Sequence, residues 1–125
     1  MILVDTNIFI EFYKNNNDIC EILENIDVQE IVVNDIVCAE LYYGAVNKRE
    51  LNDIVADMEK LSILSILPQI SKLAVNLVKQ FCLSHKLKLP DALIAATALF
   101  YDIELFTLNI KDFQFIPNLK LYKMT

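Results

Sequence analysis

The sequence predicts an α/β protein built as one domain, and three observations support this. A length of 125 residues suits a single domain that can bury its own core. Only one Gly and three Pro occur in a chain that is 55% hydrophobic, which argues against a loop-rich or disordered protein. Short apolar runs alternate with segments of helical periodicity, a pattern typical of parallel strands covered by helices on both faces. We therefore expect one domain over residues 1–125.

Short apolar or β-branched runs mark the expected strands. The run Ile2-Leu3-Val4 ends at an acid, and Ile31-Val32-Val33 is β-branched throughout. Because no repeat, linker or low-complexity segment separates the runs, we expect all of them in one domain. The strands are expected at residues 2–4, 31–33, 63–66, 104–108 and 119–123.

Helical periodicity fills the segments between the strands. Pro90 suits the first turn of a helix, because the N–H that proline lacks would be unpaired there. The helix that follows is apolar nearly all round, so we expect it in the middle of the domain. The helices are expected at residues 6–13, 18–26, 35–44, 48–61, 68–81 and 92–101.

The hydropathy pattern predicts a cytoplasmic protein that binds other protein chains. The longest stretch without charge, residues 61–71, is eleven residues long, against the roughly 20 that a membrane helix needs. The first residues meet an acid at Asp5 and have no basic region, unlike a signal peptide. Mean hydropathy is +0.39, so surplus apolar surface is expected to face another chain.

The cysteines and the single histidine favour structural roles. Cys20, Cys38 and Cys82 are widely spaced and form no CxxC pair, so we expect buried, reduced thiols. His85 follows a long amphipathic run, and we expect it on the surface at a helix end. Neither a zinc site nor a Ser-His-Asp arrangement is predicted.

Four acids stand where a site is expected in a parallel sheet. Asp5 ends the first strand, and Glu40 lies in the helix after the second strand. Asp91 opens the central helix, and Asp112 follows the strand at 104–108. Sites in open parallel sheets form beyond the carboxyl ends of the strands, so all four acids are expected at one edge.

Clustered carboxylates suit metal-assisted hydrolysis. Their oxygens are hard ligands that bind Mg²⁺ or Mn²⁺, and a set made of acids alone disfavours zinc and copper. Without a cation, carboxylates within about 4–6 Å raise one another's pKa. Bound cations can orient a phosphodiester and activate water. Each acid alone also has an ordinary explanation as a cap, a solvated helix residue, a first-turn acid or a turn residue.

Four short motifs place these acids in a recognisable order. They are Ile2-Leu3-Val4-Asp5-Thr6-Asn7, Glu40-Leu41-Tyr42-Tyr43-Gly44, Leu89-Pro90-Asp91-Ala92-Leu93-Ile94-Ala95-Ala96-Thr97-Ala98 and Phe106-Thr107-Leu108-Asn109-Ile110-Lys111-Asp112-Phe113. With them the chain resembles the PIN-domain nucleases and, among these, the VapC-type toxins of bacterial and archaeal toxin–antitoxin systems. The resemblance covers essentially the whole length.

The resemblance implies a fold, a site and an activity. It implies a sheet of about five strands in the order 3-2-1-4-5. Asp5, Glu40, Asp91 and Asp112 match the four acidic metal-site positions of the family, and Asn7 and Thr107 match flanking polar positions. For Asn7 and Thr107, simple turn and cap chemistry is an equal alternative.

The implied activity is endoribonuclease cleavage that depends on Mg²⁺ or Mn²⁺. Its substrate would be single-stranded or looped RNA, often transfer RNA, and the products would carry a 5′-phosphate and a 3′-hydroxyl. The resemblance also implies a homodimer and a VapB-type antitoxin whose C-terminal segment fills the groove that leads to the site.

The net charge of −6 opposes nucleic-acid binding, although four of the 17 acids belong to the candidate site, where cations would reverse the local field. Basic residues that are candidates for phosphate contacts are Lys14, Lys48, Arg49 and Lys111. The aromatic residues Phe12, Tyr13, Tyr42, Tyr43 and Tyr101 are candidates for base stacking, with core or dimer packing favoured for most of them.

Three alternatives compete with the nuclease. A haloacid-dehalogenase-like phosphatase needs a second Asp two residues after Asp5, where this chain has Asn7. A response-regulator receiver needs a phosphoacceptor Asp at a mid-chain strand end, and Val33-Asn34-Asp35 matches poorly. A catalytically silent binding module would keep the fold only. For the nuclease, Asp5→Ala is expected to abolish cleavage. Its thermal stability should stay equal or rise, because removing one of four clustered negative charges relieves their repulsion.

Overall fold

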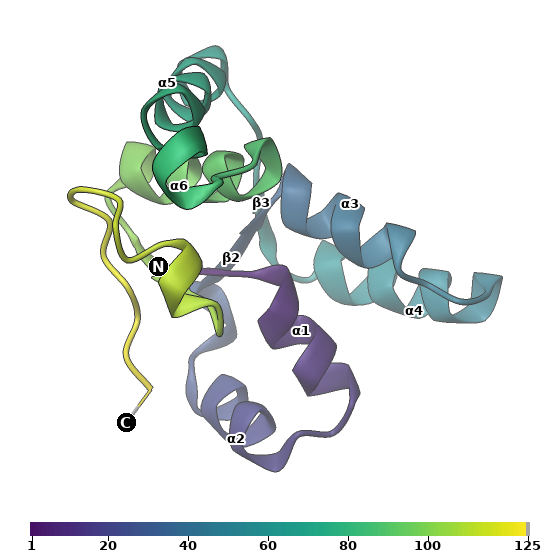
Figure 1. Cartoon of the computed structure of the whole chain (residues 1–125). Coiled ribbons are helices and arrows are strands. Elements are labelled where there is room, and N and C mark those ends of the chain that lie inside the picture. The colour runs from purple at the N-terminus through teal and green to yellow at the C-terminus, as the bar shows by residue number, and fades with distance from the viewer. Residues whose placement is uncertain (125) are drawn as a thin grey trace.

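The computed structural model describes residues 1–124 and contains a parallel four-stranded sheet in the order β3-β2-β1-β4 (Figure 1). The strands are β1 (Ile2–Val4), β2 (Ile31–Asn34), β3 (Ser62–Leu64) and β4 (Glu104–Phe106). The predicted α/β class and the parallel sheet are confirmed. All four strands are short, so most of the fold's stability comes from helices packed on the sheet.

The prediction of a fifth strand over 119–123 is wrong in extent. Within the described residues this segment forms one isolated parallel bridge, between Leu105 and Leu121, beside β4. Leu105 N donates to Lys120 O at 2.9 Å, and Tyr122 N donates to Leu105 O at 2.8 Å. The ladder stops there because the backbone after β4 bonds to side chains instead: Leu108 N donates to Asn7 Oδ1.

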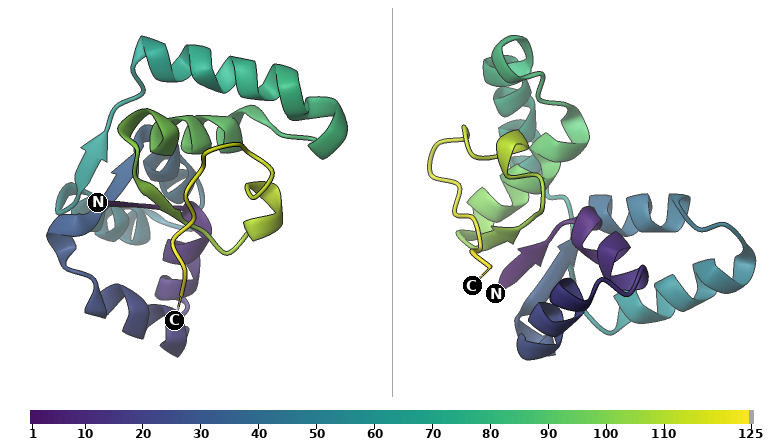
Figure 2. Two further views of the ribbon diagram at one scale, coloured as in Figure 1. Left: turned by 90° about the vertical axis from the view of Figure 1, so that its left-hand side faces the viewer. Right: turned by 60° about the horizontal axis from the view of Figure 1, so that its bottom comes forward.

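Six helices surround the sheet in the part of the chain that the structure describes. They are α1 (Thr6–Tyr13), α2 (Asn17–Asn25), α3 (Asp35–Tyr43), α4 (Lys48–Glu59), α5 (Pro68–His85) and α6 (Leu89–Tyr101), with 3₁₀ turns η1 (Val28–Glu30) and η2 (Ile110–Asp112). Helices α5 and α6 cover one face, α1 and α2 lie on the other, and α3 and α4 project as a hairpin (Figures 1 and 2).

Helix starts follow from side-chain caps. Asp5, Asn16, Asn34 and Asn47 each accept a backbone N–H in the first turn of α1, α2, α3 and α4. Helices α5 and α6 have no side-chain cap and begin with a proline in the first turn instead. Because Asp5 directly follows β1 and Asn34 ends β2, these strand ends and the helix starts after them are fixed together.

Helix α6 forms the centre of the core, as its apolar sequence predicts. Ala92, Ile94, Ala95 and Ala98 are fully buried, and α6 packs along α5 and against β4 and α3. The small alanines let α6 approach its neighbours closely. Its N-terminus, with Asp91, is thereby held at a fixed place relative to the strand ends.

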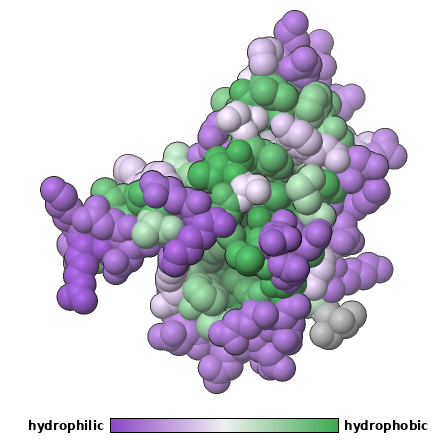
Figure 3. Space-filling view, turned by 180° about the vertical axis from the view of Figure 1, so that it is seen from behind, coloured by the Kyte–Doolittle hydropathy of each residue, from purple (hydrophilic) through white to green (hydrophobic). Residues whose placement is uncertain are grey.

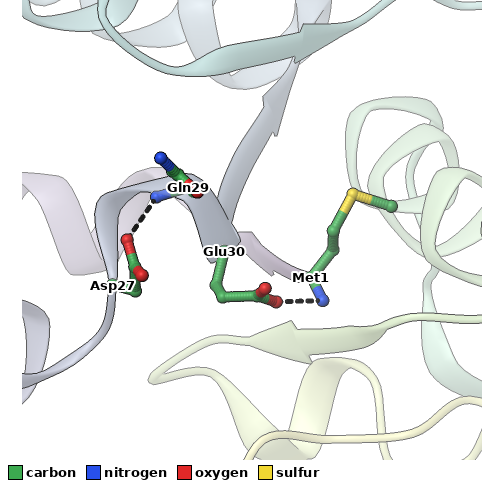
Figure 4. Close-up of polar contacts among 4 residues, drawn as sticks. All are labelled: Met1, Asp27, Gln29 and Glu30. Carbon is green, nitrogen blue, oxygen red and sulfur yellow. Dashed lines mark hydrogen bonds and ion pairs between the residues drawn. The ribbon is translucent and has the colours of Figure 1, made fainter.

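The amino ends of β1 and β2 are joined by a charged contact. The Met1 amino group donates to Glu30 Oε2 at 2.7 Å, and the preceding turn is capped by Asp27, whose Oδ1 accepts from Gln29 N at 3.0 Å (Figure 4). Both partners of the ion pair are about half exposed, so it adds little stability. The contact lies at the opposite end of the strands from the four acids.

The surface carries substantial apolar area. Viewed from behind, apolar atoms spread over the middle of the molecule, while the projecting lobe formed by α3 and α4 is hydrophilic (Figure 3). Tyr43 and Leu83 are more than 90% exposed. Among residues 1–124, no helix is long and apolar enough to cross a membrane.

The cysteine prediction holds for one residue of three. All three thiols are free, but only Cys38 is buried, whereas Cys20 is half-buried and Cys82 is exposed. Cys82 is exposed because it lies on the outer side of α5. His85 is the last residue of α5 and is exposed, as predicted, and its ring stacks on Phe115 with centroids 3.9 Å apart.

Candidate active site

Asp5 is the buried member of the predicted acid set. It leaves β1 and caps α1, and only 5% of its surface is exposed. Its Oδ1 accepts from Thr6 N at 2.7 Å, and its Oδ2 accepts from the Thr107 hydroxyl at 2.8 Å. Burial raises the pKa of Asp5, while these donors oppose the rise. The two hydrogen bonds offset part of the cost of burying the Asp5 carboxylate, and they also fix its orientation.

Asn7 and Thr107 form the frame around Asp5. Asn7 Nδ2 donates to Asp5 Oδ2 at 3.2 Å and to Thr107 Oγ1 at 3.3 Å, and Asn7 Oδ1 accepts from Leu108 N at 3.1 Å. Thr107 Oγ1 also accepts from Asn109 N at 3.1 Å. Both residues thus make turn contacts and contacts to Asp5 at once. The turn contacts expected for both residues are confirmed, and their accessory role at a metal site stays a prediction.

Glu40 reaches this frame through a residue that sequence reasoning missed. Thr6 Oγ1 donates to Glu40 Oε1 at 2.7 Å, which joins the start of α1 to the middle of α3. Glu40 is exposed, and within residues 1–124 this is the one hydrogen bond that it makes to another side chain. The only signal for Thr6 in the sequence is its position next to Asp5. Contact with an acid 34 residues away cannot be deduced from that position.

Asp91 reports that the acids lie close together. Its pKa is raised to about 6, first by burial and then by the negative charges of Asp5, Asp112 and Glu40. Asp91 lies in the first turn of α6 and is half-buried. The four predicted acids therefore lie near enough for their charges to interact. Asp5 has the largest charge effect on the pKa of Asp91, followed by Asp112 and then Glu40.

Asp112 and two lysines stand at the outer side of the acid cluster. Asp112 is exposed and ends η2, where its N–H donates to Asn109 O at 3.0 Å. Lys88, which precedes α6, lowers the pKa of Asp91 through its positive charge and is a second residue that sequence reasoning missed. Lys111 is the exposed neighbour of Asp112 within η2.

The donor set suits a hard divalent cation. The four acids supply carboxylate oxygens only, and such a set favours Mg²⁺ or Mn²⁺. In the described part of the chain, no three such side chains already stand in an arrangement that would hold an ion. Glu40 and Asp112 are exposed, so their side chains can turn inward when a cation offsets the repulsion among the acids.

Open grooves reach the acids from two sides. One, of about 660 Å³, is lined by Thr6 and Glu40 together with Pro90 and the apolar side chains Ile10, Ile36, Tyr43, Leu89 and Leu93. A second, of about 930 Å³, runs from Glu40 between α1 and α4 and is rich in acids. A third, apolar groove of about 480 Å³ adjoins it and shares Tyr13, Asp57 and Lys60. The Tyr13 hydroxyl donates to Asp57 Oδ2 at 2.8 Å where the second and third grooves meet.

The residues predicted to contact RNA lie in different surroundings. Lys14 pairs with Glu11 at 3.7 Å, and Lys48 and Arg49 begin α4 on the hydrophilic lobe. Phe12, Tyr42 and Tyr101 pack against the core, as the sequence favours, whereas Tyr43 is 93% exposed and Tyr13 is 38% exposed.

Similarity to known proteins agrees with the fold and extends over nearly the whole chain. The family model described as the PIN domain matches residues 2–116. Ribonuclease VapC19 of Mycobacterium tuberculosis is 28% identical over 123 residues, which cover 96% of this chain and 98% of that protein.

Two solved structures are similar over nearly the full length. A chain of a toxin–antitoxin complex from Klebsiella pneumoniae is 32% identical, with 95% of both chains covered and a TM-score of 0.81. A chain of VapBC2 from Rickettsia felis, bound to a DNA fragment from its promoter, is 29% identical, with 98% of both chains covered and a TM-score of 0.78. With the family model matching residues 2–116, the chain belongs to the PIN domain family.

Proposed function

We propose that this protein is a divalent-metal-dependent endoribonuclease and the toxin of a toxin–antitoxin pair, with Asp5, Glu40, Asp91 and Asp112 as its catalytic and metal-binding residues. The observation that carries the proposal is the convergence of the acids: Thr6 donates to both Asp5 and Glu40 at 2.7 Å, and the charges of Asp5, Asp112 and Glu40 act on Asp91 and help to raise its pKa. Four acids from four elements that interact in this way suit a shared cation. The similarity to Ribonuclease VapC19 supports RNA as the substrate.

Each residue has a distinct part in the proposed mechanism. Bound Mg²⁺ or Mn²⁺ supplies Lewis-acid activation of the scissile phosphate and of water. Asp5 and Asp91, the less exposed acids, would hold the cation, and the exposed Glu40 and Asp112 would complete its ligands. Asn7 and Thr107 keep the Asp5 carboxylate in one orientation through the bonds at 3.2 and 2.8 Å.

The substrate fits the groove beside the acids. The groove that Thr6, Glu40 and Pro90 line is open and has apolar walls, so it can accept the bases of an unpaired RNA segment. Lys88 and Lys111 stand at the acids and contact phosphates on either side of the cleaved bond. Transfer RNA is the proposed target class, cut to leave a 5′-phosphate and a 3′-hydroxyl.

The groove between α1 and α4 is the proposed binding site for the antitoxin. It is continuous with the apolar groove through Tyr13, Asp57 and Lys60, and it ends at Glu40. Its acidic lining, which includes Glu50 and Asp53, favours a basic segment whose apolar side chains enter the neighbouring groove. A VapB-type antitoxin that fills both grooves would cover the way to the acids. The similar structures from Klebsiella pneumoniae and Rickettsia felis are toxin–antitoxin complexes, which supports such a partner.

Exposed apolar side chains also favour self-association. Val75 and Leu83, both on α5, are 59% and 94% exposed, and a second copy of the chain packed on this helix would remove their apolar surface from water. We propose a homodimer, to be tested by light scattering after gel filtration. A monomer at micromolar concentration would contradict it.

RNA cleavage tests the activity directly. Antitoxin-free protein incubated with a transfer RNA mixture in Mn²⁺ or Mg²⁺ is expected to produce discrete fragments and to stop in EDTA. Asp91→Asn is expected to lose cleavage. Asp53→Asn on α4, which removes an acid from the neighbouring groove only, should keep it. Equal cleavage by parent and Asp91→Asn would overturn the assignment.

Two other classes make different predictions in the same preparations. A phosphatase would form an aspartyl adduct with beryllofluoride. None is expected here, because the carboxylates of a nuclease site bind metal and are not phosphorylated, and because Asn7 stands where such a phosphatase has its general acid. A silent binding module would show no carboxylate-dependent uptake of Mn²⁺ in calorimetry, whereas the nuclease should lose that uptake in Asp91→Asn.

A further inference from the structure

Two polar side chains meet in the core away from the acid cluster. Asn34 and Thr97 are both 0% exposed, and Asn34 Nδ2 donates to Thr97 Oγ1 at 3.0 Å. Asn34 ends β2 and caps α3, and Thr97 lies in the middle of α6. Their neighbours along these elements, such as Val33, Ala96 and Ala98, are apolar and fully buried. A valine would fill the space of Thr97 without a polar atom that needs a hydrogen-bond partner. Packing alone therefore does not explain why a threonine stands here.

The hydrogen bonds leave this pair only one arrangement. Asn34 Oδ1 accepts from Val37 N at 3.0 Å, so the amide group must turn its Nδ2 toward α6. The Thr97 hydroxyl donates to Leu93 O at 2.8 Å, so its oxygen is left to accept from Asn34. Flipping the amide would set its NH₂ group against the N–H of Val37. The chain of bonds therefore donates in one direction, from the start of α3 through Asn34 and Thr97 to Leu93 O in α6.

This chain of bonds joins the two helices that bring Glu40 and Asp91 to the site. Glu40 lies six residues after Asn34, and Asp91 lies six residues before Thr97, which is about 9 Å along each helix. Aliphatic packing resists separation of α3 and α6 but has little directional preference against sliding. The four acids repel one another when no cation is bound, so the site needs a contact of fixed length and direction.

We propose that Asn34 and Thr97 are positioning residues, forming a buried bridge that sets α3 against α6 so that Glu40 and Asp91 are spaced to share one divalent cation. The inference rests on the proposed metal-dependent function. It adds two residues that lie outside the acid cluster, and neither touches substrate.

The first test measures Mn²⁺ affinity by calorimetry in Thr97→Val. The variant keeps the volume but leaves the Asn34 amide without an acceptor, and its affinity is expected to fall about tenfold, as when supporting partners of a metal site are removed. Thr97→Ser keeps the hydroxyl and should restore parental affinity. If the Thr97→Val and Thr97→Ser proteins both bind Mn²⁺ as the parent does, the bridge is overturned.

A stability-matched control separates positioning from a general loss of folding. Ile19 is buried on α2, a helix that carries none of the four acids. Ile19→Val and Ile19→Ala are expected to bracket the drop in Tm caused by Thr97→Val while leaving Mn²⁺ affinity unchanged. If the Ile19 variant of equal Tm loses the same affinity, the effect is structural only and the proposal fails.

A second variant applies if Thr97→Val does not fold. In Asn34→Ser the shorter side chain can still cap α3 but cannot reach Thr97, and the Thr97 hydroxyl keeps its bond to Leu93 O. The same loss of Mn²⁺ affinity is expected, about tenfold. Parent protein that binds no Mn²⁺ would refute the proposed function itself, whereas parent and Asn34→Ser that bind equally would refute the bridge alone.

Discussion

The hydroxyl of Thr6 donates a hydrogen bond of 2.7 Å to Oε1 of Glu40, which ties the first residue of α1 to the exposed acid of α3. Thr6 N also donates to Asp5 Oδ1 at 2.7 Å, so one residue contacts two of the four acids. The orientation of Glu40 therefore depends on the turn that follows β1. This relationship makes Thr6 a means of testing the site without changing its charge.

Thr6→Val is expected to weaken Mn²⁺ binding and RNA cleavage by about three- to tenfold, because Glu40 loses the donor that orients it. Stability should change by less than about 1 kcal/mol, since the bond is exposed to solvent. Thr6→Ser keeps the donor and serves as the control in calorimetry and cleavage assays. Parental affinity in Thr6→Val would mean that Glu40 is oriented by other contacts.

Removal of Asp5 and removal of Asp91 should have opposite effects on stability. Asp5→Ala loses the cap of α1 and leaves the donors of Thr6 and Thr107 without their acceptor, so we expect a loss of about 1–2 kcal/mol in the free energy of unfolding. This revises the expectation from charge repulsion alone, which ignored those bonds.

Asp91→Asn removes charge repulsion without breaking a side-chain hydrogen bond of Asp91 within residues 1–124, so a gain of about 1 kcal/mol is expected in metal-free buffer. Urea unfolding of both variants measures the difference. A loss of stability in Asp91→Asn would show that repulsion among the acids is weak.

The stability of the metal-free protein should fall as pH rises through the range of the Asp91 titration. The pKa of Asp91 is raised from 3.8 to about 6, so between these values the folded state holds more protons than the unfolded state. The free energy of unfolding therefore decreases from about pH 4 to about pH 6 through this group and is then constant. After allowance for solvent screening the decrease is about 1–2 kcal/mol.

Asp91→Asn is the control for this pH dependence, and its unfolding free energy should lack most of the decrease. Burial raises the pKa of Asp5 too, so part of the slope remains in the variant. Urea titrations in EDTA at several pH values give both curves. If the free energy of unfolding depends on pH equally in the parent and in Asp91→Asn, a group other than Asp91 causes the decrease.

Lys88 is expected to help the RNA backbone approach an otherwise acidic site. Its positive charge lowers the pKa of Asp91, so Lys88→Met should raise the pKa of that carboxyl further. The slope of log affinity against log salt for single-stranded RNA should become shallower by about 0.7. Lys79→Met, at an exposed position on α5, is the control. An unchanged salt dependence in Lys88→Met would exclude a phosphate contact.

Most of the fold could be predicted from the sequence because strand runs and helix periods are local signals. The strand ends could not, since they depend on contacts between distant residues. The strand predicted over 63–66 ends early because Ile66 N donates to Asp35 Oδ2 at 3.0 Å instead of joining the sheet. The strand predicted over 104–108 ends at Phe106 because Thr107 and Leu108 bond to Asp5 and Asn7.

For the candidate site, the sequence predicts the acids together with Asn7 and Thr107, which frame Asp5, but not the other supporting residues. Asp5 directly follows β1 and Asp112 lies in the turn after β4, beyond the carboxyl ends of the strands, where sites form in any parallel sheet. Thr6, Lys88 and the Asn34–Thr97 bridge depend on which helices come together, and no spacing along the chain encodes that. The assignment of all four acids to one metal site stays a prediction.

A crystal structure of antitoxin-free protein soaked in Mn²⁺, with the ion located by its anomalous scattering, tests this central claim most directly. We predict a Mn²⁺ peak bound by oxygens of Asp5 and Asp91 at about 2.1–2.3 Å, with Glu40 or Asp112 turned inward to complete its ligands. An ion bound elsewhere, or carboxylates that stay more than about 10 Å apart in saturating Mn²⁺, would contradict the account.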